Sequence, residues 1–331
     1  MFSCFGDSKY EKALMRNGRS LLEKSVALNN GRGNPVRCFS VKELQNATNS
    51  YSQHNVFYID GTCRLYKGLI RDRPVIVKKY DYKHPSEDPV SDIVIASEMS
   101  VHRNVLKLLG CCLESEIPIP VFEYAEKGTL EDYVQKTALL WKDRLKIAVD
   151  VASVIAYLHT AFPRPIVHRD ISLASILLDE DCAAKVTGFS LSISIPEGET
   201  HIEDEVAGTI GYVAPEYFMK RMFNEKIDVY SFGVVLLVLL TGHGPILRSP
   251  TTNESHALVV FVEAKIKNER FNEIIDPAIL EEGPWPEKEQ QLKSFLTLAM
   301  QCTRKDEEDR PEITDVAKQL RHIYHSLMSD C

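Results

Sequence analysis

The chain has 331 residues, of which 44% are hydrophobic and 26% charged, and this composition excludes a disordered or fibrous protein. Its length allows one large domain or two lobes with a sizeable core. A net charge of −8 argues against binding to nucleic acid or to anionic membranes. The longest apolar run, Phe232 to Leu240, is shorter than the roughly 20 residues of a membrane span.

Residues 1–38 are predicted to form an N-terminal basic amphipathic segment followed by a linker. Residues 7–28 repeat apolar side chains at an approximate helical period, which predicts a helix docked on the body of the protein. Two glycines and a proline within 29–35 then end the helix. The first residues lack the pattern of a secretory signal, and Phe2 excludes N-myristoylation. Cys4 stays a candidate for palmitoylation, which as a single acyl chain would anchor only weakly.

The eight cysteines follow no paired spacing, which disfavours zinc sites and, in a cytosolic chain, disulfides.

Two further regions differ in their patterns. Residues 39–125 favour short strands around one helix, with β-branched segments such as 75–77 and 119–122. Residues 126–325 carry long helical patterns at 139–159, 294–302 and 315–327. Residues 326–331 are assigned to a C-terminal tail. The sequence therefore predicts an α+β protein with a small β-rich lobe and a larger helical lobe.

Several short motifs occur in a fixed order along these two regions. They are Val75-Ile76-Val77-Lys78, His168-Arg169-Asp170, Ala214-Pro215-Glu216, Asp228 to Gly233, and Asp309-Arg310-Pro311. In this order and spacing the set resembles the signature of protein kinases. The resemblance implies the bilobal protein-kinase-like fold, with an N-lobe at 39–125 and a C-lobe at 126–325, in which Glu216, Asp228 and Arg310 hold the helical lobe together.

The nucleotide-binding elements implied by this resemblance are degenerate. The glycine-rich pattern would place glycines at positions held here by Tyr58, Asp60 and Cys63, whose side chains obstruct the approach of phosphate. Gly61, Leu65 and Lys78 remain as candidate ATP-binding residues.

The residue before Val77 is also unusual. Ile76 stands where the family has alanine against adenine, so it plugs the pocket unless the strand shifts to admit the base. The carboxylate that should pair with Lys78 is Asp92 in the best register, with Glu98 as the competitor.

The catalytic residues are only partly retained. Asp170 keeps the position of the catalytic base, although we expect it not to function, and Arg169 keeps the position that pairs with a phosphorylated activation segment. Ser172 replaces the phosphate-binding lysine, and Ser175 and Gly188 replace the two metal ligands. Because phosphoryl transfer depends on these charges, we expect no metal site, no required cofactor and severely impaired catalysis, with weak ATP binding without metal left open.

The stretches Phe39 to Asn49 and His102 to Glu114 resemble plant receptor-like cytoplasmic kinases. Together with the lost metal ligands, Ala161 to Pro165 and Ser194 to Thr200 resemble their pseudokinase subgroup, which pairs with coiled-coil nucleotide-binding leucine-rich-repeat immune receptors. The resemblance implies an adaptor or decoy in plant innate immunity, whose partners are such a receptor and either active receptor-like cytoplasmic kinases or pathogen effectors. It also implies a cytoplasmic location, peripheral at the plasma membrane only through partners.

The activation segment, Ser190 to Tyr212, is expected to be exposed and to present the partner-binding residues Ser194, Glu197, Thr200 and Thr209. The receptor-facing surface is expected on the N-terminal helix and near 56–58 and 101–103.

Two other functions stay open. One is a low-activity ATP-dependent serine/threonine protein kinase that uses Asp170 and Lys78 with a displaced metal ligand, Asp179 or Asp181. The other is a regulator that activates another kinase by dimerisation of the lobes.

Overall fold

The computed structural model describes residues 7–29, 35–81, 86–248, 254–285 and 287–328. The chain divides into two compact units. The small unit holds residues 1–128, 177–180 and 185–192, and the large unit holds residues 129–176, 181–184 and 193–331. Within the described ranges, no helix is both long enough and apolar enough to cross a membrane.

The small unit is built on a five-stranded antiparallel sheet with the order β1-β2-β3-β5-β4. Two of its strands contain the segments 75–77 and 119–122, as the sequence predicts. The strands are β1 (Val56–Ile59), β2 (Cys63–Ile70), β3 (Arg73–Tyr80), β4 (Leu108–Cys112) and β5 (Ile119–Glu123).

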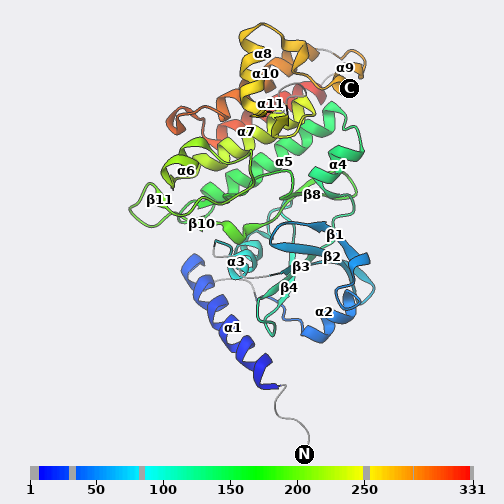
Figure 1. Cartoon of the computed structure of the whole chain (residues 1–331), viewed down its shortest axis with the longest axis vertical. Coiled ribbons are helices and arrows are strands. Elements are labelled where there is room, and N and C mark those ends of the chain that lie inside the picture. The colour runs from blue at the N-terminus through cyan, green and yellow to red at the C-terminus, as the bar shows by residue number, and fades with distance from the viewer. Residues whose placement is uncertain (1–6, 30–34, 82–85, 249–253, 286, 329–331) are drawn as a thin grey trace, which may run out of the picture. The chain divides into compact units, whose positions relative to one another are not determined.

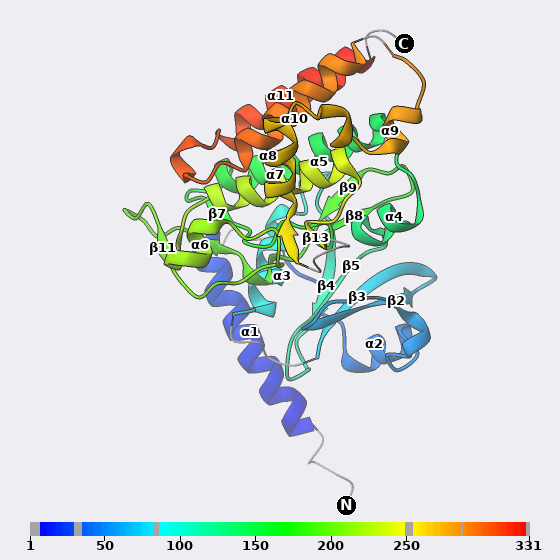
Figure 2. The ribbon, with the colours of Figure 1, turned by 45° about the horizontal axis from the view of Figure 1, so that its top comes forward.

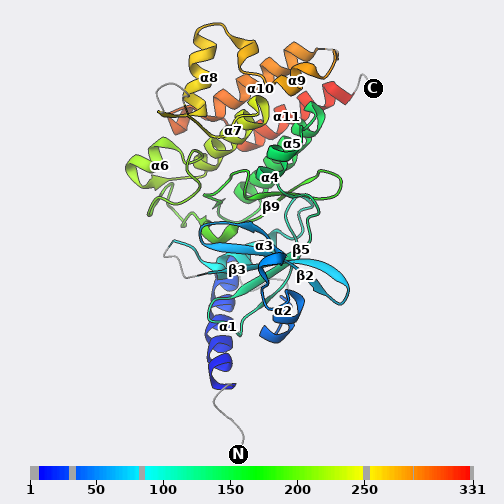
Figure 3. The same ribbon diagram turned by 45° about the vertical axis from the view of Figure 1, so that its right-hand side comes forward.

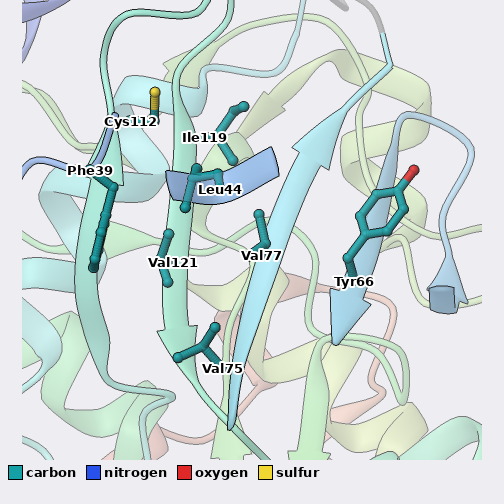
Figure 4. Close-up of a cluster of buried hydrophobic side chains, with 8 residues drawn as sticks. All are labelled: Phe39, Leu44, Tyr66, Val75, Val77, Cys112, Ile119 and Val121. Carbon is teal, nitrogen blue, oxygen red and sulfur yellow. The ribbon is translucent and has the colours of Figure 1, made fainter. Parts of the chain in front are cut away.

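One face of this sheet packs against helix α2 (Val41–Ala47), which lies beside β2 in Figure 3. Figure 4 shows the apolar cluster between them, which includes Leu44, Val75 and Val77. The helix begins with a capping box, in which Ser40 Oγ accepts the Glu43 N–H and Glu43 Oε2 accepts the Ser40 N–H. Since side chains alternate along a strand, Ile76, Lys78 and Tyr80 lie on the opposite face of β3.

Helix α1 (Asp7–Asn29) confirms the predicted N-terminal helix. It lies beside α3 (Pro89–Met99) in Figures 1 and 2. Asn17 is buried and its Nδ2 donates to the carbonyl oxygens of Leu113 and Ser115 at 2.9 and 2.8 Å. The helix is therefore docked on the small unit by these polar contacts and by Leu21, which packs against the buried cluster of Ile93, Cys111 and Leu113. The predicted linker is described only from residue 35 on, and Cys4 lies outside the described residues.

The remaining elements of the small unit are short. They are the 3-10 helices η1 (Gln53–Asn55) and η2 (Phe189–Leu191). Three further strands include residues of both units: β6 (Gly128–Thr129), β8 (Ile176–Leu178) and β9 (Ala184–Val186).

The large unit is helical, and its longest helices confirm the helical patterns of the sequence. Figure 2 shows α5, α7, α10 and α11 packed together. Its helices are α4 (Leu130–Lys136), α5 (Trp141–Thr160), α6 (Pro215–Lys220), α7 (Lys226–Thr241), α8 (Leu258–Lys267), α9 (Pro277–Glu281), α10 (Lys288–Cys302) and α11 (Ile313–Met328), with 3-10 helices η3 (Phe271–Glu273) and η4 (Glu307–Asp309). Because α11 continues to Met328, part of the segment assigned to a tail is helical.

Three pairs of short antiparallel strands complete the large unit. They are β7 (Ile166–Val167) with β10 (Ile193–Ser194), β11 (Ile202–Glu203) with β12 (Met222–Phe223), and β13 (Ile246–Arg248) with β14 (Ser255–Ala257).

A buried ion pair holds the large unit together. Arg310 donates from both terminal nitrogens to the carboxylate of Glu216, at 2.6 and 2.7 Å. The Arg310 side chain is fully buried, so this bidentate pair is shielded from water. The predicted structural role of Arg310 and Glu216 is confirmed.

Candidate functional site

Lys78 on β3 is buried against Asp92 on α3. Its Nζ lies 2.8 Å from Asp92 Oδ2, and the side chains are 9% and 0% exposed. Of the two carboxylates that the sequence left open, Asp92 is therefore the partner of Lys78. A buried ion pair is stable only when further hydrogen bonds satisfy the remaining polar atoms.

Two more groups donate hydrogen bonds to the Asp92 carboxylate. The Tyr80 hydroxyl donates to Oδ2 at 2.7 Å, and the Phe189 backbone N–H donates to Oδ1 at 2.8 Å. Burial alone would lower the pKa of Lys78, but the Asp92 carboxylate outweighs it and raises that pKa well above its usual value. The Lys78 ammonium and the Asp92 carboxylate thus have all of these partners within the small unit.

The turn between β1 and β2 is narrow where a kinase has its glycine-rich loop. The Asp60 N–H donates to the Cys63 carbonyl at 2.9 Å, which closes the turn. Asp60 Oδ1 accepts the Gly61 N–H at 2.6 Å. A backbone amide that could face phosphate is therefore bound by a carboxylate of the same turn.

Leu65 and Ile76 are both buried in the sheet of the small unit. Leu65 lies directly opposite Lys78 in the pairing of β2 with β3. Ile76 is 0% exposed, so its side chain packs within the protein and is not displayed on the surface.

Gly188 occupies the position of a metal-binding aspartate and adopts a left-handed conformation, with φ 88° and ψ 50°. It immediately precedes Phe189, whose N–H is bound by Asp92. The position therefore offers no ligand atom beyond the backbone.

In the large unit, the carboxylate of Asp170 is engaged by the activation segment. Thr209 donates to Asp170 Oδ1 from its backbone N–H at 2.9 Å and from its hydroxyl at 2.7 Å. Asp170, predicted at the catalytic-base position, and Thr209, predicted to bind a partner, are thus brought together.

The catalytic loop is held by Asp228, which lies on α7 and is fully buried. Its carboxylate accepts the backbone N–H groups of His168 and Arg169 at 2.7 and 2.9 Å, and it lies 2.9 Å from His159 Nε2. The sequence predicted that Asp228 ties this lobe together, and these contacts confirm it.

Ser172 and Ser175 bind each other and offer little to a cation. The Ser172 N–H donates to Ser175 Oγ at 3.0 Å, and Ser175 Oγ donates to the Ser172 carbonyl at 3.1 Å. Magnesium prefers carboxylates, which neither Ser175 nor Gly188 supplies. The residues at the family's two metal-ligand positions do not fit a magnesium ion.

The activation segment is exposed only in part. Residues 196–200 are exposed, so Glu197 and Thr200 lie on the surface, whereas Ser194 is half-buried in β10. Ser190, Leu191 and Tyr212 are buried. The expectation that the whole segment from Ser190 to Tyr212 is exposed was therefore wrong, because both ends pack into the protein.

Residues 60–320 match the family model of protein tyrosine and serine/threonine kinases, and the chain belongs to the protein kinase family. It is 40% identical over 319 residues to a protein of Arabidopsis thaliana named non-functional pseudokinase ZED1, covering 93% of this chain and 95% of that protein. It is also 36% identical over 332 residues to the serine/threonine-protein kinase ZRK1 of the same plant, covering 96% and 94%.

Longer receptors match as well. Wall-associated receptor kinase-like 1 of Arabidopsis thaliana is 37% identical over 326 residues, which are 96% of this chain and 44% of that protein. This chain therefore corresponds to a part of such receptors.

Two residues with contacts at these positions, Tyr80 and Asp204, are not predicted from the sequence. Tyr80 follows Lys78 by two residues, so the alternation of β3 places both on one face and could have indicated it. Asp204 lies in the activation segment, and its Oδ2 is 3.0 Å from Arg169 Nη1. Nothing in the sequence distinguishes it from the neighbouring acidic residues.

Proposed function

We propose that this chain is a catalytically inactive or severely impaired kinase that serves as an adaptor or decoy in plant innate immunity. It would bridge a nucleotide-binding leucine-rich-repeat immune receptor and an effector or an effector-modified kinase. The observation that carries the loss of catalysis is the absence of a ligand side chain at Gly188. The relative named as a non-functional pseudokinase supports the same reading.

One contact in the large unit favours a role in binding over one in catalysis. Asp170 Oδ1 accepts two hydrogen bonds from Thr209, whereas the pairing of Lys78 with Asp92 in the small unit is compatible with both roles, because active kinases also need a lysine–carboxylate pair there. A catalytic base must reach the proton that it removes. An adaptor needs none of this chemistry, and it acts in the cytoplasm without a required cofactor.

Thermal unfolding with ATP, with and without magnesium or manganese, tests the loss of catalysis, because a ligand that binds only the folded state raises its stability. We expect no metal-dependent shift and no phosphoryl transfer. A metal-dependent shift that is lost in Lys78→Met would support the alternative, a low-activity serine/threonine kinase, which the name of the relative ZRK1 favours.

Capture of partners tests the adaptor role. Glu197 and Thr200, which are exposed, are proposed to contact the kinase or effector together with Ser194 and Thr209. Replacing Ser194 to Thr200 by alanine and glycine should abolish that capture and leave receptor capture unchanged. If capture of the kinase or effector and capture of the receptor were both unchanged, residues 194–200 would be excluded as the contact surface for the kinase or effector.

We place the receptor-facing surface on α1 and near residues 56–58 and 101–103. The face of α1 away from its docked side exposes Met15 and Leu22, at 75% and 65%, and large exposed apolar side chains mark interaction sites when they gather. Replacement of both by serine should weaken receptor capture, and replacement of the exposed Lys12 by serine is the control.

A further inference from the structure

Arg169 is a buried cation of the catalytic loop that is bound by the activation segment. Its side chain is 1% exposed, and Nη1 lies 3.0 Å from Asp204 Oδ2. Nη2 donates to the Glu205 carbonyl oxygen at 2.8 Å. The guanidinium also lies over the rings of Phe223 and Tyr217, 4.8 and 5.6 Å from their centroids. A cation buried this far requires an anion beside it.

Asp204 is fixed from its own side as well. Its backbone N–H donates to the Arg221 carbonyl at 3.0 Å, at the end of the β11–β12 pair. Its Oδ1 accepts the Glu205 N–H at 2.8 Å. One carboxylate therefore joins the catalytic loop, through Arg169, to a turn of the activation segment.

The residues that follow Asp204 contact Tyr217 and the catalytic loop. The Tyr217 hydroxyl donates to the Glu205 carbonyl and accepts the Ala207 N–H at 3.1 Å. Thr209 then binds Asp170, the neighbour of Arg169. Residues 204–209 are thus held by contacts with Arg169 and Asp170 of the catalytic loop and with Tyr217 of α6.

A phosphate added to an activation segment supplies charge and acceptor oxygens to such an arginine, and in this way it orders the segment. Here a carboxylate encoded in the sequence already supplies both. We infer that Asp204 is a built-in anion that holds the activation segment in its ordered path, so that the segment is presented to partners without phosphorylation of this chain. The link to partners rests on the proposed function, whereas the role of Asp204 does not.

Hydrogen exchange of the full chain tests this role at the amides of Ala207 and Thr209. Asp204→Ala should raise their exchange rates on the order of tenfold, because the local opening of the segment becomes easier. Glu203→Gln is the matched control, since Glu203 is an exposed acid on the adjacent position of β11. It should leave both rates unchanged, and the amides of α7 should stay protected in both variants.

Rescue by an anion separates this role from a merely structural one. Inorganic phosphate should restore the protection of Ala207 and Thr209 in Asp204→Ala, because it can occupy the space beside Arg169, and sodium chloride of equal ionic strength should not. Wild-type protein should respond to neither salt. Full protection of Asp204→Ala, or loss that phosphate does not restore, would overturn the inference.

A second pair of variants keeps the test decisive if Asp204→Ala unfolds. Asp204→Asn removes the charge at constant size and should expose the two amides, whereas Asp204→Glu keeps the charge and should protect them. Equal exchange in both variants would overturn the inference. Because these measurements use no partner, they can fail while the capture experiments succeed, and the reverse also holds.

Discussion

Thr209 places its backbone N–H and its hydroxyl on the same carboxylate oxygen of Asp170, at 2.9 and 2.7 Å. Both residues belong to the large unit, where this contact joins the activation segment to the catalytic loop. The carboxylate at the catalytic-base position therefore serves a structural purpose in this protein.

Replacing Thr209 by valine should destabilise the large unit by about 1.5–3 kcal/mol, the usual contribution of a hydrogen bond to a charged group. Valine keeps the shape and the backbone N–H but removes the hydroxyl. Urea unfolding followed by tryptophan fluorescence measures the change. Thr200→Val, at an exposed position, is the control and should alter the free energy of unfolding by less than about 0.5 kcal/mol. Equal effects of the two variants would contradict the prediction.

Gly110 on β4 should not tolerate a side chain. A Cβ at this position would lie 2.4 Å from the Arg37 carbonyl oxygen and 2.6 Å from Phe39 Cε2. Gly110→Ala must therefore displace the strand-like segment that carries Phe39, which packs in the core of the small unit. We expect a loss of about 1–3 kcal/mol, as for other overpacked sites, measured by thermal unfolding.

Gly61→Ala is the matched control for Gly110→Ala. No atom lies within 4 Å of the corresponding Cβ position at Gly61, so the stability should change by less than about 0.5 kcal/mol. A loss at Gly61 as large as that at Gly110 would show that the clash is not the cause.

The fold was largely predictable from the sequence, and the internal contacts of the site were not. Motifs such as His168-Arg169-Asp170 and the helical periods of 139–159 and 315–327 indicate the fold. Each of these patterns depends only on the spacing of residues that are close together in the sequence. The loss of metal ligands at Ser175 and Gly188 is also visible in the sequence. In contrast, the pairing of Arg169 with Asp204 joins residues 35 positions apart, and no local pattern selects one acid from the four among Glu199 to Glu205.

The buried pair of Lys78 and Asp92 gives the next prediction. Lys78→Met leaves the Asp92 carboxylate buried without its counter-ion, and removal of one partner from such a pair typically costs about 3–5 kcal/mol. Chemical unfolding of the small unit should show this loss. Lys12→Met makes the same chemical change at an exposed position of α1 and should have little effect. A small effect of Lys78→Met would mean that Tyr80 and Phe189 suffice to hold Asp92.

Alkaline pH should weaken the cluster around Asp92. Burial, reinforced by Asp92, raises the pKa of Tyr80 well above its usual value of 10.0, and the pKa of Lys78 is also raised. In the unfolded chain both groups lose their protons near their usual pKa, whereas in the folded chain they keep them. Their contribution to stability is therefore complete below about pH 10 and is lost as the pH rises further.

Tyr80→Phe isolates the part of this effect that is due to the tyrosine. The free energy of unfolding of the wild type should fall more steeply between pH 10 and 11 than that of the variant, by up to about 1.4 kcal/mol per pH unit, because one fewer group titrates. Tyr10→Phe is the control, since Tyr10 is 48% exposed, and it should keep the wild-type slope. Identical slopes for wild type and Tyr80→Phe would show that the Tyr80 hydroxyl ionises in the folded protein as readily as in the unfolded chain, contrary to its hydrogen bond with Asp92.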